Sequence, residues 1–165
     1  MTSPSKFNRA SLAACASIVF LAGCLHEPTA LPPCAVGSFT KASTNGDTIT
    51  TTTGLEYIEG APGTGNSTGW CKTLSVHYDA FLADGTKLES THDNGVPLVF
   101  TPGIGVLIDG FEQGVMEMRV GGTRRIIVPP NLAYGSNDVK DSSGKVIIPP
   151  NSTLVYDIEI VEVAP

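Results

Sequence analysis

The stretch that decides the fold reads VGGTRRIIVPPNLAYG (120–135), then a polar loop, then IIPP (147–150). A Gly-Gly pair leads into a β-branched run typical of a strand, and a double proline stops it because proline has no N–H for the ladder. The second proline pair precedes an alternating segment (153–163), which predicts a final strand. Two strands joined by a compact, proline-bounded connection are therefore expected.

Outside this stretch, alternation of apolar and polar residues predicts further strands, and only one segment has convincing helical spacing. In that segment Ile108, Phe111, Val115 and Met118 recur, and we expect Gly121-Gly122 to end the helix. The other expected strands are 55–58, 74–82, 86–90 and 98–100, with 39–53 supplying one or two edge strands. The pattern predicts an α+β fold in which one short helix covers an antiparallel sheet.

Composition limits the possible functions. The chain has 165 residues, of which 41% are hydrophobic and 16% charged, as in a globular protein. Its formal charge is −6 and it has no block of Lys or Arg residues, so we expect no binding to nucleic acid.

The first 23 residues are expected to be a signal peptide. Lys6 and Arg9 precede an apolar stretch (10–22) that is too short for a permanent span. The stretch ends in LAGC (21–24), which resembles the bacterial lipobox, so Cys24 is the expected site of lipidation. An ordinary signal peptide or a buried apolar helix are the alternatives. Because Leu25 rather than Asp follows the cysteine, we expect an outer-membrane anchor facing the periplasm.

The remaining cysteines form an even pair. Cys15 leaves with the signal peptide and Cys24 carries the lipid, so Cys34 and Cys71 are left in an oxidising compartment. A disulfide between them is expected, with two free thiols as the alternative.

Motifs for other chemistries are missing from the sequence. The three histidines, His26, His77 and His92, have no metal-ligand spacing and no accompanying Cys cluster. There is no Gly-rich phosphate loop and no Gly-x-Ser-x-Gly turn. We therefore expect neither a metal nor a cofactor.

Several motifs in register resemble the FKBP-type peptidyl-prolyl cis-trans isomerases. Besides the stretch quoted first, they are VHY (76–78), LADGTK (82–87), LIDGFEQG (107–114), LAYG (132–135) and IPPNSTLVY (148–156). The resemblance runs from Gly54 to Val163. It divides the chain into a signal peptide (1–23), a lipidated tether with possible extra strands (24–53) and an isomerase domain (54–165).

The resemblance implies a half-wrapped sheet of five to six strands around the helix, with an apolar pocket between them. The residues carried over as catalytic are Tyr78, Glu89, Phe100, Phe111, Tyr134 and Tyr156. Those carried over as substrate-binding are Leu88, Leu98, Leu107, Ile108 and Ile148. In the family, the residue at Phe111 forms the pocket floor, the hydroxyl at Tyr134 binds a substrate carbonyl, and the backbone N–H at Ile148 binds macrolide ligands.

The chain also departs from the family pattern. Leu88 stands where Phe is usual, Glu89 replaces Asp, Leu98 replaces an aromatic residue and Tyr156 replaces Phe. These changes make the pocket less aromatic, which bears on turnover and on macrolide affinity.

The expected function is isomerisation of Xaa-Pro bonds in extracytoplasmic proteins by a lipid-anchored monomer. A site that binds the twisted imide better than the planar one needs no nucleophile or metal. The alternative is a non-catalytic binding or chaperone module that uses the same pocket. A β-rich structural lipoprotein would require every motif match to be accidental.

Overall fold

The computed structural model describes residues 41–45 and 48–164. The expected signal peptide, Cys24 and Cys34 lie outside the described residues. The strands are β1 (Lys41–Asn45), β2 (Thr48–Thr51), β3 (Glu56–Pro62), β4 (Leu74–Leu82), β5 (Lys87–Ser90), β6 (Leu98–Phe100), β7 (Gly122–Val128), β8 (Val139–Lys140), β9 (Val146–Ile148) and β10 (Leu154–Val163). The helices are α1 (Asp109–Gly114) and a 3-10 turn (Pro130–Leu132).

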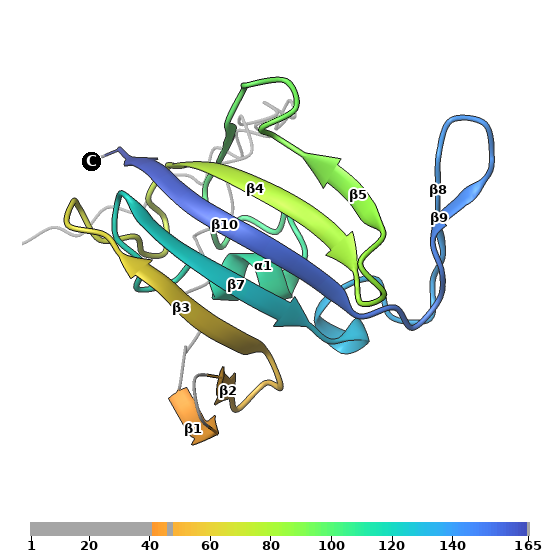
Figure 1. Cartoon of the computed structure of the whole chain (residues 1–165), viewed down its shortest axis with the longest axis horizontal. Helices are drawn as coiled ribbons and strands as arrows, with labels where there is room; N and C mark the ends of the chain where they lie inside the picture. Colours follow the sequence, from red (N-terminus) through yellow and green to blue (C-terminus); the bar gives the residue numbers. More distant parts are fainter. Residues whose placement is uncertain (1–40, 46–47, 165) are drawn as a thin grey trace, which may run out of the picture. The chain divides into compact units, whose positions relative to one another are not determined.

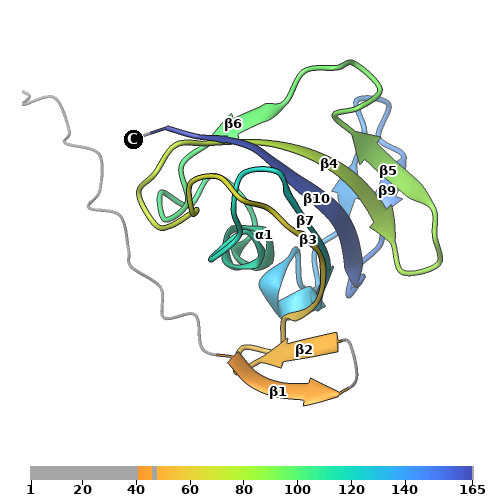
Figure 2. The same ribbon diagram turned by 60° about the vertical axis from the view of Figure 1, so that its left-hand side comes forward.

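Eight strands form one antiparallel sheet. Seven follow the order β1-β2-β3-β7-β10-β4-β5 (Figure 1), and the eighth, β6, pairs with β4 (Figure 2). The predicted fold class, an antiparallel sheet around one short helix, is confirmed. The sheet has more strands than five to six because the hairpin β1–β2 extends it beyond β3. In addition, β5 and β6 pair with different halves of β4.

The sheet curls around α1, which lies on its concave side (Figure 2). This arrangement follows from the alternation of side chains along the strands. In β4 and in the first half of β10, every second residue is buried and the residues between them are partly exposed. Residues of the concave face are fully or almost fully buried, among them Leu74, Val76, Ile126, Val128, Leu154 and Ile160.

Helix α1 lies close to β7, and glycines permit the approach. A Cβ on Gly110 would overlap Val128 Cγ1, and one on Gly114 would lie 2.7 Å from Ile126 Cδ1. Both partners are β-branched and fully buried, so neither can move aside at low cost. The two glycines thus bring the helix, and Phe111 between them, against the sheet.

The helix ends earlier than the sequence indicates, at Gly114 rather than at Gly121-Gly122. Glu117 in the following turn has a φ of 62°, a left-handed conformation that interrupts the helix. Buried side chains hold the carbonyls of this turn. Arg124 donates to Gly114 O (2.7 Å) and Met116 O (2.8 Å), and Thr68 donates to Val115 O (2.7 Å). These donors satisfy the carbonyls that an ending helix leaves free.

Candidate active site

An apolar cavity of about 510 Å³ lies between the concave face of the sheet and α1. It collects ten of the eleven residues carried over as catalytic or substrate-binding. Its lining consists of Tyr78, Ala80, Leu88, Glu89, Leu98, Val106, Leu107, Ile108, Phe111, Tyr134, Val139, Ile147, Ile148 and Tyr156. Phe100 does not line the cavity but lies behind Phe111, with ring centroids 5.6 Å apart.

Phe111 lies at the centre of an aromatic cluster. Its ring makes edge-to-face contacts with Tyr78 (5.5 Å between centroids), Phe100 (5.6 Å) and Tyr156 (5.1 Å), and the residue is 3% exposed. Such T-shaped pairs are favourable because the positive ring edge meets the negative ring face. The Phe111 ring is therefore packed against three neighbouring rings on the side of the cavity that α1 supplies.

A buried carboxylate positions the loop that carries three lining residues, Val106, Leu107 and Ile108. Glu112 is 4% exposed and accepts hydrogen bonds from Gly103 N–H (2.9 Å) and, more weakly, from Leu107 N–H (3.5 Å). A charged acceptor makes strong bonds to backbone N–H groups. The loop between β6 and α1 is therefore tied to the helix that supplies the cavity floor.

Tyr134 lies at the edge of the cavity. The residue is 39% exposed, and its position follows from the turn after β7, where Gly135 N–H donates to Pro130 O (2.8 Å). Asn151 N–H donates to Gly135 O (2.7 Å) and so links this turn to the start of β10. Tyr134 thus lies in a turn that backbone hydrogen bonds hold at the entrance of the cavity.

Four lining residues were missed from the sequence: Ala80, Val106, Val139 and Ile147. Ala80 shares a strand face with Tyr78, so alternation alone would have found it. Val139 and Ile147 come from the hairpin β8–β9, whose strands are only two and three residues long inside a polar loop. No local pattern marks such short strands.

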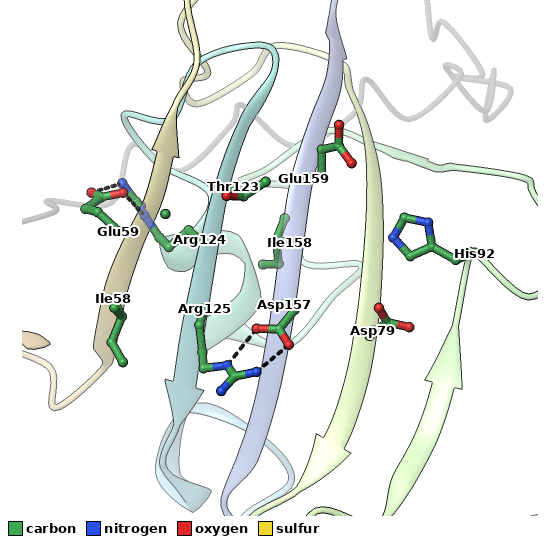
Figure 3. Close-up of a pocket in the computed structure, with 11 residues that line it drawn as sticks. Ile58, Glu59, Asp79, His92, Thr123, Arg124, Arg125, Asp157, Ile158 and Glu159 are labelled. Carbon is green, nitrogen blue, oxygen red and sulfur yellow. Dashed lines mark hydrogen bonds and ion pairs between the residues drawn. The ribbon is translucent and has the colours of Figure 1, made fainter. Parts of the chain in front are cut away.

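A second depression, of about 430 Å³, lies on the convex face of the sheet (Figure 3). Its charged groups are already paired in part, since Arg125 makes two hydrogen bonds to Asp157 (2.7 and 2.6 Å). Arg124 also borders this depression, but its guanidinium lies on the opposite, buried side of β7, where it pairs with the Glu59 carboxylate and donates to carbonyls at the end of α1 and just after it. Most side chains around this depression are charged, whereas most of those around the cavity beside α1 are aromatic or aliphatic, so we place the candidate site in the cavity.

Among residues 41–45 and 48–164, no three His, Cys, Asp or Glu side chains are grouped so as to hold a metal ion. No helix in the same part of the chain is long and apolar enough to cross a membrane. Cys71 is disulfide-bonded, and its expected partner, Cys34, lies outside the described residues.

The two buried phenols of the cavity are held in their neutral form. Burial, then the charge of Glu89 and a hydrogen bond with it, raise the pKa of Tyr78 to about 12. Burial also raises the pKa of Tyr156. Both hydroxyls therefore remain protonated at neutral pH.

These shifts predict a loss of stability in alkali. Below pH 10, the unfolded-state pKa, the phenols are neutral in both states and their contribution is fully present. As pH rises from 10 to about 12, the unfolded chain loses the Tyr78 proton first, so the free energy of unfolding falls. Urea unfolding at pH 8 to 11.5 should show this fall, and Tyr78→Phe should reduce its slope. An unchanged slope in the variant would contradict the assignment.

Comparison with known proteins agrees with the geometry of the site. The profile of the family described as FKBP-type peptidyl-prolyl cis-trans isomerase matches residues 69–161. Peptidyl-prolyl cis-trans isomerase Fkbp12 of Drosophila melanogaster is 39% identical over 113 residues, which are 67% of this chain and 98% of that protein. Photosynthetic NDH subunit of lumenal location 4 of Arabidopsis thaliana is 38% identical over 68% of this chain.

The match covers only part of some relatives. The chain spans 54% of the Arabidopsis subunit and 60% of FK506-binding protein 2 of Yarrowia lipolytica. Among solved structures, FkpA from Escherichia coli superposes with a TM-score of 0.63 at 34% identity, over 73% of this chain and 53% of that one. AtFKBP13 has a TM-score of 0.64 at 30% identity, over 78% of this chain and all of that one.

The profile match covers more than half of the chain, and the fold and the cavity lining agree with it. The chain therefore belongs to the FKBP-type peptidyl-prolyl cis-trans isomerase family.

Proposed function

We propose that the protein accelerates cis-trans rotation of Xaa-Pro bonds in other polypeptides, with the cavity beside α1 as its active site. The observation that carries this proposal is the lining of the cavity: an aromatic floor, aliphatic walls and a few polar groups near the entrance. The lining offers no metal cluster and no Cys or Ser nucleophile.

The chemistry requires only differential binding. Resonance keeps the imide planar behind a barrier of about 18–20 kcal/mol. In the twisted transition state the carbonyl oxygen carries less negative charge, so the group is less polar than the planar imide. A largely apolar cavity, from which the bound segment displaces water, therefore binds the twisted form better. Lowering the barrier by about 7–8 kcal/mol would accelerate rotation by roughly 10⁵–10⁶-fold.

Individual residues have distinct proposed roles. Phe111, supported by Phe100, forms the floor under the proline ring, and Tyr134 donates its hydroxyl to a substrate carbonyl at the entrance. Tyr78 and Glu89 form a polar pair on the wall that orients the bound segment. Ile148, at the end of β9, would present its backbone N–H to substrates or to macrolide ligands.

The cellular setting is proposed from the N-terminal sequence. Lipidation at Cys24 would tether a monomeric domain to the outer membrane, where it would act on periplasmic proteins, and a Cys34–Cys71 disulfide would tie the tether to the domain. The Arabidopsis relative is named for a lumenal location. Labelling with radioactive palmitate should mark the wild type but not Cys24→Ser. Equal labelling of both would rule out this anchor.

The test of activity is isomerisation of a short Xaa-Pro peptide. We expect catalysis by the wild type, and we expect kcat/KM to fall about tenfold in Tyr134→Phe, which loses one hydrogen bond but no packing. A folded wild type that accelerates no Xaa-Pro peptide would overturn the enzyme proposal.

A non-catalytic binding module is the second candidate, favoured by Leu88, which removes an aromatic ring from the family's pocket, and by Glu89, which places the carboxylate one methylene further from the backbone than Asp. In that case the wild type would be inactive and the double variant Leu88→Phe, Glu89→Asp would gain activity. If the wild type is active and the double variant changes little, the binding-module interpretation loses its support.

A further inference from the structure

Tyr156 places a hydroxyl group in the wall of the cavity, at a position where a phenyl ring alone would provide the apolar contacts. The residue lies in the middle of β10 and is 9% exposed. Its ring packs edge-to-face against Phe111 (5.1 Å) and Tyr78 (6.0 Å). These contacts are ring contacts, and a phenylalanine would make them equally well.

The Tyr156 hydroxyl has no hydrogen-bond partner among the residues that the structure describes. In the same part of the chain, no side-chain nitrogen or oxygen atom is both inaccessible and unpaired. Since Tyr156 lines the cavity, its hydroxyl is open to the cavity space. It differs in this from Tyr78, whose hydroxyl interacts with the Glu89 carboxylate that raises its pKa, and from Tyr134, which lies at the exposed edge.

The surroundings keep this hydroxyl a donor. The charges that act on it come from Tyr134, Tyr78 and Glu89, which are the polar groups of the same cavity. Burial raises its pKa, so it carries its proton at any physiological pH. The cavity therefore contains one buried donor that the protein itself leaves unused.

A ligand that fills the cavity displaces the water that hydrates the Tyr156 hydroxyl. It must then either accept a hydrogen bond from this hydroxyl or leave it without a partner. The second outcome is unfavourable, because a buried polar group that loses its partner is destabilised. The ring carbons of proline offer no acceptor. The imide offers two, the carbonyl oxygen in the planar form and the nitrogen once twisting localises its lone pair.

We propose that Tyr156 is a specificity-determining residue whose hydroxyl donates to the imide of a bound Xaa-Pro segment and so selects it over apolar ligands of the same shape. This inference rests on the proposed function, since it assumes that the cavity binds prolyl segments. It adds a second donor, deep in the cavity, to Tyr134 at the entrance.

The test compares two peptides of equal shape, one with an Xaa-Pro imide and one in which a carbon–carbon double bond replaces that imide. Their dissociation constants are measured by NMR titration with the full chain, for the wild type and Tyr156→Phe. We expect the substitution to weaken binding of the imide peptide about five- to tenfold, the effect of one neutral hydrogen bond. Binding of the alkene peptide should stay within about twofold or become tighter.

Tyr57→Phe is the matched control, because Tyr57 is a buried phenol on β3 that does not line the cavity; it should change neither constant. An equal change for both peptides in Tyr156→Phe, or none for the imide peptide, would overturn the proposal. If Tyr156→Phe fails to fold, the two dissociation constants of the wild type are the test. The wild type should bind the imide peptide about fivefold or more tightly than the alkene peptide. Equal affinities would contradict the proposal.

Isomerisation of the imide peptide is followed in parallel. Selective binding of the imide peptide without catalysis would contradict the enzyme proposal and support the role of Tyr156. Catalysis by the wild type, with no loss of selectivity for the imide peptide in Tyr156→Phe, would support the enzyme proposal and contradict the role of Tyr156.

Discussion

Replacing Arg124 by Met should lower the free energy of unfolding by about 3–5 kcal/mol, a large part of the stability of a single domain. Arg124 is 4% exposed, its guanidinium carbon lies 4.4 Å from the centroid of the Tyr57 ring, and its guanidinium donates to Gly114 O and Met116 O. Methionine keeps most of the volume but leaves two buried carbonyls without donors, each worth about 1–3 kcal/mol. Urea unfolding measures the loss.

Arg125→Met is the matched control, one residue further along the same strand. The Arg125 side chain is 53% exposed and pairs with Asp157, which is 39% exposed, on the solvent face. Exposed pairs contribute about 0–1 kcal/mol, so this variant should lose little. Equal losses at the two positions would contradict the capping role of Arg124.

Glu59→Gln separates the ion pair from the cap. The Glu59 carboxylate is 48% exposed, so it is hydrated when its partner is removed, and Arg124 keeps its bonds to the two carbonyls when Glu59 is neutralised. We expect a loss of about 1 kcal/mol. If Glu59→Gln matched Arg124→Met, the ion pair rather than the helix end would account for the effect.

Phe111→Ala should have the largest effect on activity. It removes the ring that touches Tyr78, Phe100 and Tyr156 and opens a hole in the cavity floor. Truncation of a buried Phe lowers the free energy of unfolding by about 3–5 kcal/mol. The loss of the apolar surface under the proline ring should reduce kcat/KM by roughly 10–200-fold. Both are measured at a temperature where circular dichroism shows the variant folded.

Phe111→Leu distinguishes lost stability from lost catalysis. Leucine restores most of the buried volume, so the stability loss should be below about 1.5 kcal/mol, while the flat aromatic floor is still missing. We expect kcat/KM between those of the wild type and Phe111→Ala. A folded Phe111→Ala variant with wild-type kcat/KM would place the active site elsewhere.

Much of the fold and most of the site follow from local sequence. Strand β4 has the bounds that its alternation predicts, 74–82, and the buried face of β10 contains the predicted residues Leu154, Tyr156, Ile158 and Ile160. Alternation is a strong signal here because one face of each strand is buried against α1 and the other meets solvent. The motifs in register then identified ten of the fourteen cavity-lining residues.

The sequence by itself thus determined the long strands of the main sheet, the presence of one α-helix and most residue types around the cavity, because these depend on periodicity and on short motifs. Only the tertiary structure decided where the helix ends, which residues complete the wall and which hydroxyl is left unpaired. Helix α1 stops at Gly114, where donors from Thr68 and Arg124 reach its carbonyls. Such contacts join residues up to about fifty positions apart, and no local pattern encodes them.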